Sequence, residues 1–271
     1  MVLESVNFHF WPYCNFHCIY CFVHFKKVKN LLSREHHLRI IDELAKYGTI
    51  KLNLVGGEPT LCPYLGELIE RSKDLGMITG VVSNGLGITQ QFVEQYGSNL
   101  DIIGLSLDSG DEAIQKRLGR GNGSHIQKVI RKSKTIKEAG INLKINSVIT
   151  RLNYAEDMTN IIELINPNRW KVFQVLEIQG QNSKNVNNLS ISGAEFQQFV
   201  KKHKHLNPIV EDNEAMIDSY VMIDAWGRFF RNTQKIYTFS NSILKVGVIN
   251  AINELRCNLV KPLRRNKSYV W

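Results

Sequence analysis

The chain has 271 residues, of which 43% are hydrophobic and 22% are charged, as in an ordinary globular protein with a sizeable buried core. No apolar run approaches the roughly 18 residues that span a bilayer, and the first residues lack a signal-peptide pattern, so we expect a cytoplasmic protein. The formal net charge of +9 favours an anionic partner without identifying it.

Short runs of β-branched and aromatic residues alternate with amphipathic segments along the first 205 residues. This alternation predicts parallel strands joined by right-handed helical crossovers, in an open doubly wound sheet or in a complete or partial barrel. The predicted strands cover residues 5–10, 51–55, 78–83, 101–107, 143–149 and 170–178. The predicted helices begin after Ser33 and lie near 63–75, 89–96, 124–139 and 155–165. Capping-box spacing predicts two helix starts, at Ser109 with Glu112 and at Ser192 with Glu195.

The pattern changes at about residue 206. Residues 219–230 predict an antiparallel hairpin that turns around Asp224 to Gly227, and residues 242–255 predict a helix. The aromatic content of this part argues against a disordered tail. We therefore divide the chain into a core at 1–205 and an extension at 206–271 that packs on the core.

Three of the five cysteines lie within eight residues, in the stretch CNFHCIYC at 14–21. Structural zinc sites take four ligands, usually in two pairs, and no second pair follows, although His17 and His24 lie near enough to be considered. A four-iron cluster held by three thiolates explains the spacing better, because it leaves one iron open for a substrate or cofactor. The candidate metal ligands are Cys14, Cys18 and Cys21.

Three predicted strands each place two polar side chains on one face, because residues two apart in a strand point the same way. The pairs are Lys51 with Asn53, Lys144 with Asn146, and Arg169 with Lys171. Buried unpaired cations cost several kcal/mol each, so these residues lie at an exposed edge, form salt bridges, or face a cavity that holds an anion. The repetition on three strands favours the anion, which lysine and arginine can grip without a Walker loop.

The CxxxCxxC motif after the first predicted strand resembles that of the radical S-adenosylmethionine enzymes, with Tyr20 as the aromatic residue before the last cysteine. Further matches follow the later strands in order, as GGEP at 56–59, SNG at 83–85 and LSLDS at 105–109. A lone CxxxCxxC is a moderate signal, but its combination with GGEP at this distance is a strong one. The resemblance implies a 4Fe-4S cluster, S-adenosyl-L-methionine on its open iron, and a one-electron donor such as a flavodoxin or ferredoxin.

Within that superfamily the chain resembles the viperin family of nucleotide-modifying enzymes. The matching runs are SVNFHF, GRGNG, LKINSVI, RWKVFQ, DSY, SILKVGV and the terminal YVW. The resemblance implies a partial (βα)6 barrel whose C-terminal extension closes the active site, which decides between the sheet and the barrel left open above. It also implies a soluble enzyme with no membrane anchor, because the first strand begins within five residues of Met1, and we expect no direct binding of nucleic acid.

The resemblance also implies roles for individual residues. Those expected to bind the cofactor are Tyr20, Gly57, Glu58, Asn84, Ser106, Arg120 and Gln174. Those expected to bind a nucleoside triphosphate are Asn7, Lys51, Asn53, Lys144, Asn146, Arg169 and Lys171. Tyr220, in DSY, would supply hydrogen late in the reaction.

The implied reaction converts a ribonucleoside triphosphate to its 3'-deoxy-3',4'-didehydro analogue. A 5'-deoxyadenosyl radical would remove the ribose 4' hydrogen, and the 3'-hydroxyl would leave as water, giving a chain terminator for viral polymerases. The resemblance favours CTP, then UTP, with GTP as a further possibility. Two other classes stay open: a radical enzyme that acts on a peptide or RNA, and a non-catalytic metal-binding module attached to nucleic acid.

Overall fold

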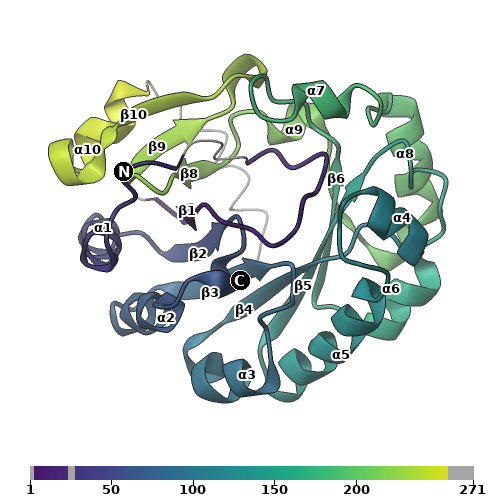
Figure 1. Ribbon diagram of the computed structural model, residues 1–271, viewed down its shortest axis with the longest axis horizontal. Coiled ribbons are helices and arrows are strands. Elements are labelled where there is room, and N and C mark those ends of the chain that lie inside the picture. Colours follow the sequence, from purple (N-terminus) through teal and green to yellow (C-terminus); the bar gives the residue numbers. More distant parts are fainter. Residues whose placement is uncertain (1–2, 24–27, 256–271) are drawn as a thin grey trace.

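The computed structural model describes residues 3–23 and 28–255. Its strands form one sheet, in the order β10-β9-β8-β1-β2-β3-β4-β5-β6-β7. The sheet curves into an incomplete barrel with its helices on the outside (Figure 1). The prediction of a partial barrel is thus confirmed, since the two ends of the sheet belong to β10 and β7 and do not pair.

Six parallel strands form the wall of the barrel and pair with their neighbours in sequence. They are β1 (Ser5–Trp11), β2 (Lys51–Gly56), β3 (Ile78–Ser83), β4 (Ile102–Ser106), β5 (Asn142–Ile149) and β6 (Arg169–Gln174). All six were predicted from the sequence. The last one was predicted too long, to residue 178. Its partner β5 ends at Ile149, whose carbonyl accepts the amide of Val175, one residue after β6 ends.

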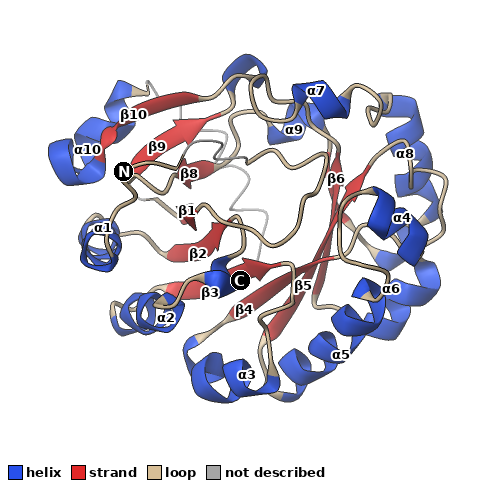
Figure 2. Cartoon of the chain, in the orientation of Figure 1, coloured by secondary structure: helices blue, strands red, loops and turns tan. Residues whose placement is uncertain are grey.

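The helices lie on the outer face of the curved sheet (Figure 2). They are α1 (Arg34–Lys46), α2 (Leu65–Asp74), α3 (Gln90–Tyr96), α4 (Glu112–Arg117), α5 (His125–Glu138), α6 (Thr159–Ile165), α7 (Ser183–Val186), α8 (Gly193–Lys202), α9 (Asn213–Met216) and α10 (Ile243–Glu254). Among residues 3–23 and 28–255, none of the helices has both the length and the apolar character required to cross a membrane.

One of the two predicted capping boxes is present. Ser192 and Glu195 cap α8 reciprocally, as expected. At α4 the prediction was wrong, because the helix begins one residue after Asp111, whose carboxylate accepts the free amides of the first turn. The carboxylate of Glu112 instead accepts the amide of Ile126, 2.7 Å away, at the start of α5. The nearer carboxylate therefore displaced the predicted cap.

The residues after 206 continue the sheet at both of its edges. Strand β7 (Ile209–Glu211) pairs in parallel with β6, and β8 (Val221–Ile223) pairs in parallel with β1. The predicted hairpin is confirmed as β8 and β9 (Arg228–Arg231), followed by β10 (Thr238–Ser242). The division of the chain at residue 205 stays a prediction, and the terminal YVW lies outside the described residues.

Alternation along the strands separates the core from a central cavity. Val6, Phe8 and Phe10 of β1 are fully buried in the hydrophobic core. Asn7 and His9, between them, line the cavity on the inner side of the sheet. The strands thus carry polar side chains inward because a space, rather than packed core, fills the centre of the barrel.

Candidate active site

A cavity of about 470 Å³ occupies the inside of the partial barrel, within the size range of ligand sites. Its walls include all three clustered cysteines, Tyr220, all seven predicted substrate-binding residues and six of the seven predicted cofactor-binding residues. The exception is Glu58. The structure therefore brings together residues that lie more than 200 positions apart in sequence.

The cysteine loop follows β1 and is held by the end of α4. The amides of His17 and Ile19 donate to the carbonyls of Gly119 and Leu118, at 3.3 and 3.1 Å. Gly119 has a φ of +78°, and a Cβ there would lie 2.2 Å from the carbonyl oxygen of His17. Only glycine fits such a left-handed position pressed against another backbone.

The three thiols share one wall of the cavity and are close enough to influence one another. Burial raises the pKa of Cys14, Cys18 and Cys21, and the charges of the other two thiols raise that of Cys21 further, to about 12. Within the described part of the chain, no three histidine, cysteine or acidic side chains are placed to hold a single metal ion. Each thiolate of a four-iron cluster binds a different iron, so the thiols need not converge, and this donor set fits such a cluster.

Of the two histidines considered as a fourth zinc ligand, His17 is exposed and His24 lies outside the described residues.

The GGEP turn after β2 packs directly on the cysteine loop. The amide of Gly57 donates to the carbonyl of Trp11 at 2.6 Å, and that of Glu58 donates to the carbonyl of Tyr13 at 2.7 Å. A Cβ on Gly57 would lie 2.3 Å from the Tyr13 carbonyl oxygen. The glycine is therefore required by close backbone approach as well as by any ligand.

Glu58 lies behind the cavity wall rather than on it. Its carboxylate accepts hydrogen bonds from the Ser83 hydroxyl and the Asn84 amide, each at 2.7 Å, and from the hydroxyl of Thr60 at 2.6 Å. Burial nevertheless raises the pKa of this carboxylate. These bonds tie the GGEP turn to the SNG turn, so the structure gives Glu58 a part in shaping the site.

Asp108 is a member of the site that the sequence reasoning missed. It is the fully buried fourth residue of LSLDS, and its Oδ2 accepts a 2.6 Å hydrogen bond from Nε of Arg120 and another from the hydroxyl of Tyr20. Its Oδ1 accepts the amide of Val148 at 2.9 Å. A buried guanidinium needs such a partner, so the presence of Arg120 was the available signal.

Two other predicted cofactor residues are already engaged within the protein. The amide of Gln174 donates to the carbonyl of Ile191 at 2.9 Å and accepts from the backbone of Asn213 at 3.2 Å. The side chain of Asn84 donates to Asn15 at 2.7 Å. Ser106 lines the cavity.

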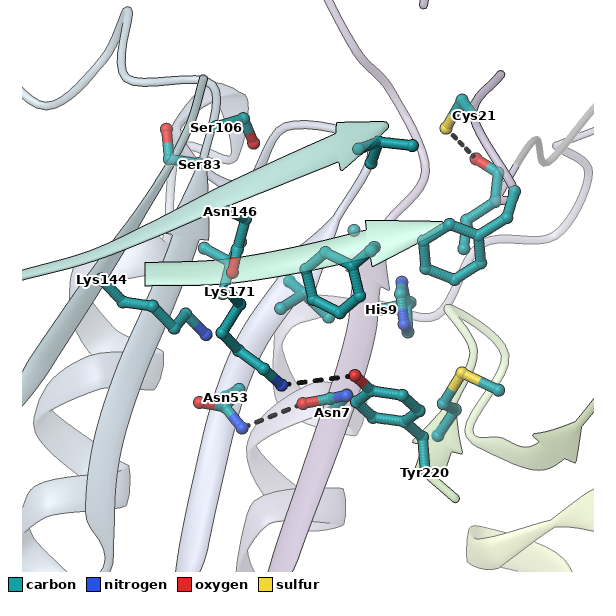
Figure 3. A pocket seen from close by; sticks show the side chains of 18 of the residues that line it. Asn7, His9, Cys21, Asn53, Ser83, Ser106, Lys144, Asn146, Lys171 and Tyr220 are labelled. Atoms are coloured by element: carbon teal, nitrogen blue, oxygen red, sulfur yellow. Dashed lines mark hydrogen bonds between the residues drawn. The ribbon is translucent and has the colours of Figure 1, made fainter. Parts of the chain in front are cut away.

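The predicted cations form one wall of the cavity, which we call the cation wall: Lys51, Lys144, Arg169 and Lys171. Strand register places Lys144 opposite Arg169 and Asn146 opposite Lys171. Burial, reinforced by the charges of the other three cations, lowers the pKa of Lys51 to about 6. All four side chains thus face one cavity, which is one of the alternatives that strand parity left open, and Figure 3 shows Lys144 and Lys171 reaching into it.

Two inward-facing glycines make room for the polar side chains. A Cβ on Gly104 would lie 2.8 Å from Cε of Lys144, and a Cβ on Gly80 would lie 2.8 Å from Oδ1 of Asn53. Asn53 in turn donates to Asn7 at 2.9 Å (Figure 3). These glycines could have been found from the sequence as gaps in otherwise β-branched strands.

Glu211 is a second member that the sequence reasoning missed. It is 3% exposed, pairs with the ammonium of Lys171 and accepts a hydrogen bond from the hydroxyl of Tyr220. The Lys171 ammonium and the Tyr220 oxygen are 3.5 Å apart (Figure 3). Strand β7 has three residues, too few for periodicity to indicate which way Glu211 points. Glu211 thus gives Lys171 a buried carboxylate partner behind the cavity.

Two buried polar atoms on the cavity wall have no hydrogen-bond partner within the described part of the chain, Nδ1 of His9 and Oδ1 of Asn146. Burial lowers the pKa of His9 to about 3, so its ring is neutral near pH 7. A buried polar atom without a partner costs about 1–3 kcal/mol. Both atoms are therefore candidates for contacts with a bound ligand.

A partial parallel barrel, with three cysteines after its first strand and GGEP after its second, defines the radical S-adenosylmethionine class of enzymes. The family model described as the Radical SAM superfamily matches residues 8–165. The chain is 42% identical to an S-adenosylmethionine-dependent nucleotide dehydratase of Flammeovirga pacifica, over 100% of this chain and 97% of that protein. It therefore belongs to the viperin-like family of S-adenosylmethionine-dependent nucleotide dehydratases.

A second relative and a solved structure agree with this placement. A nucleotide dehydratase of Lacinutrix mariniflava is 36% identical over 99% of this chain, which spans 59% of that longer protein. The solved structure of anSMEcpe with bound AdoMet and a peptide superposes with a TM-score of 0.71 at 15% identity, over 97% of this chain and 82% of that one. This likeness supports the fold. The family uses a 4Fe-4S cluster and S-adenosyl-L-methionine, as the resemblance implied.

Proposed function

We propose that this enzyme dehydrates a ribonucleoside triphosphate to its 3'-deoxy-3',4'-didehydro analogue. The observation that carries the proposal is the cation wall, which faces the same cavity as the three thiols. A polyanion is the natural occupant of such a wall, because it stabilises the charged forms of clustered lysine and arginine side chains, of which Lys51 and Lys171 are buried. The names of the relatives, nucleotide dehydratases, support the same substrate class.

In this proposal the cofactors generate the radical, and the protein chain positions the substrate. Cys14, Cys18 and Cys21 would hold the cluster, which together with S-adenosyl-L-methionine would supply the 5'-deoxyadenosyl radical for removal of the ribose 4' hydrogen. The barrel holds the triphosphate on the cation wall, orients the ribose toward the thiols and keeps water out. In this proposal Tyr220, which faces the cavity, supplies one hydrogen atom: its proton leaves with the 3'-hydroxyl as water and its electron completes the 3',4' double bond. The external one-electron donor, with a proton from solvent, then restores the tyrosine.

The base of the substrate is proposed from overall similarity, with CTP first, then UTP and GTP. The cation wall grips phosphates and does not read a base. Asn7 and Asn53, which face each other on the adjacent strands β1 and β2 and are joined by a hydrogen bond, line the same cavity and would contact the nucleoside. We further propose that the product acts as a chain terminator in antiviral defence. The enzyme would work in the cytoplasm, with a flavodoxin or ferredoxin as its electron donor.

An anaerobic assay tests the proposal. The protein is reconstituted with iron and sulfide and given S-adenosyl-L-methionine, a reductant and an equimolar mixture of CTP, UTP, GTP and ATP. We expect 5'-deoxyadenosine together with one dehydrated triphosphate, that of CTP, and neither product from the Cys18→Ala variant. Formation of 5'-deoxyadenosine that no triphosphate stimulates would contradict the proposal and favour a peptide or RNA substrate.

A further inference from the structure

Glu211 connects the cation wall to the tyrosine that faces the cavity, and neither the relatives' names nor the family motifs assign it a part. We infer that Glu211 is a positioning residue that fixes the phenol of Tyr220 and, through the same carboxylate, holds Lys171 back from a bound polyphosphate. This inference rests on the proposed function. Glu211 would thus increase turnover and weaken the binding of the substrate.

The contacts of Glu211 place it behind the wall of the cavity. Lys171 and Tyr220 both line the cavity, whereas Glu211 does not. Its carboxylate pairs with the ammonium of the lysine and accepts the hydroxyl of the tyrosine. The side chains of Lys171 and Glu211 are 9% and 3% exposed, so water screens their interaction little. Glu211 thus acts on the substrate through two residues that can touch it.

The two contacts of Glu211 restrain two different side chains, Tyr220 and Lys171. The phenol of Tyr220 is anchored between the carboxylate and the Lys171 ammonium, which also lies 5.7 Å from the centre of the tyrosine ring. Such anchoring reduces the number of orientations that a reactive hydroxyl can adopt. Phe173, opposite Glu211 in the strand register, lies under the same ammonium at 5.1 Å. The tyrosine is therefore held by a closed network on one side of the cavity.

The charge of Glu211 opposes the binding of a polyanion. A carboxylate directly behind the cation wall reduces the positive potential that attracts phosphates. It also engages the donors of Lys171 that a phosphate oxygen would otherwise accept. Removing this charge should therefore strengthen nucleotide binding, whereas loss of a residue that merely supports the fold would weaken it.

The Glu211→Gln variant separates charge from hydrogen bonding, because the amide oxygen still accepts the phenol. Calorimetric titration of CTP into the protein without its cluster should show affinity about 3- to 10-fold tighter than for the unchanged protein. Glu163→Gln on α6 removes the same charge from an exposed side chain and should leave the affinity unchanged. Weaker binding by Glu211→Gln, with an unchanged melting temperature, would overturn the inference.

The Glu211→Ala variant tests the second half of the inference in the reconstituted enzyme. Loss of the anchor should lower kcat about 10- to 100-fold and raise the number of 5'-deoxyadenosine molecules made for each dehydrated product. In a Tyr220→Phe background the same substitution should not change that ratio further. A ratio that stays at the value of the unchanged enzyme would overturn the positioning role. If the unchanged protein bound no triphosphate at all, the proposed function would fail first.

Discussion

The two ends of the cavity differ in how their side chains interact. At the carboxyl ends of the strands, side chains are joined by hydrogen bonds and an ion pair. Nearer the amino ends of β2 and β6, side chains of like charge lie close together. At the first end, Asp108 joins Arg120 and Tyr20, and Glu58 joins two turns. At the second end, Lys51 and Arg169 each begin a strand and face further cations.

This difference indicates how the site divides its tasks. The end with the thiols is a pre-organised frame, since Asp108, Arg120 and Glu58 are held there by partners within the chain. At the cation wall, burial and the charges of the neighbouring cations lower the pKa of Lys51. We expect substitutions at the first end to reduce stability and substitutions at the second end to reduce nucleotide affinity.

The largest effect should come from Asp108→Asn. The substitution leaves the Arg120 guanidinium, whose side chain is 9% exposed, beside a neutral amide. Removing one partner of a buried ion pair costs about 3–5 kcal/mol, so the free energy of unfolding should fall by that amount in urea titrations of the protein without its cluster. The matched control is Asp42→Asn, which breaks the more exposed pair with Arg71 and should cost about 0–1 kcal/mol. Equal costs for the two variants would contradict the idea of a pre-organised frame.

A smaller effect, on binding instead of stability, should follow from Lys144→Ala and Arg169→Ala. Each removes a charge-assisted contact to phosphate worth about 1.5–3 kcal/mol, so CTP should bind about 10- to 150-fold more weakly. Binding of S-adenosyl-L-methionine to the reconstituted protein should change less than about twofold. Arg39→Ala, on the exposed face of α1, is the control for the loss of a cation. Equal weakening of both ligands would instead indicate a folding defect.

The smallest effect concerns a proton at Lys51. With a pKa of about 6, this lysine is mostly neutral at about pH 7.5. A triphosphate stabilises the charged form and raises the pKa, so binding should take up about one proton. Titrations in buffers of different ionisation enthalpy measure this uptake. The proton uptake should vanish at about pH 5, where Lys51 is already charged. It should also vanish in the Lys51→Gln variant but persist in the Lys46→Gln control. Uptake that survives Lys51→Gln would assign the proton to another group.

Much of the wall could be predicted because strand parity is a local property. Lys51 and Lys144 face inward for the same reason that Leu52 and Ile145, next to them, are buried. The six strands of the barrel follow from the same periodicity. The choice of a barrel over a sheet came from family resemblance, because curvature depends on packing between distant strands.

The partners of these residues could not be predicted in the same way. Asp108 pairs with Arg120, 12 residues further along the chain, and Glu211 pairs with Lys171 from the neighbouring strand β7, and a single sequence does not report which side chains of separate elements meet. At Ser109 two capping patterns competed, and the shorter reach of Asp111 decided between them. Local competition and long-range pairing are thus the two places where sequence reasoning failed.

The central claim, abstraction of a ribose hydrogen from a triphosphate held on the cation wall, can be tested with deuterium. CTP labelled at the 4' position is supplied to the reconstituted enzyme, and the 5'-deoxyadenosine is analysed by mass spectrometry. The account predicts one deuterium in each 5'-deoxyadenosine that accompanies dehydrated product. Unlabelled 5'-deoxyadenosine formed together with that product would contradict it.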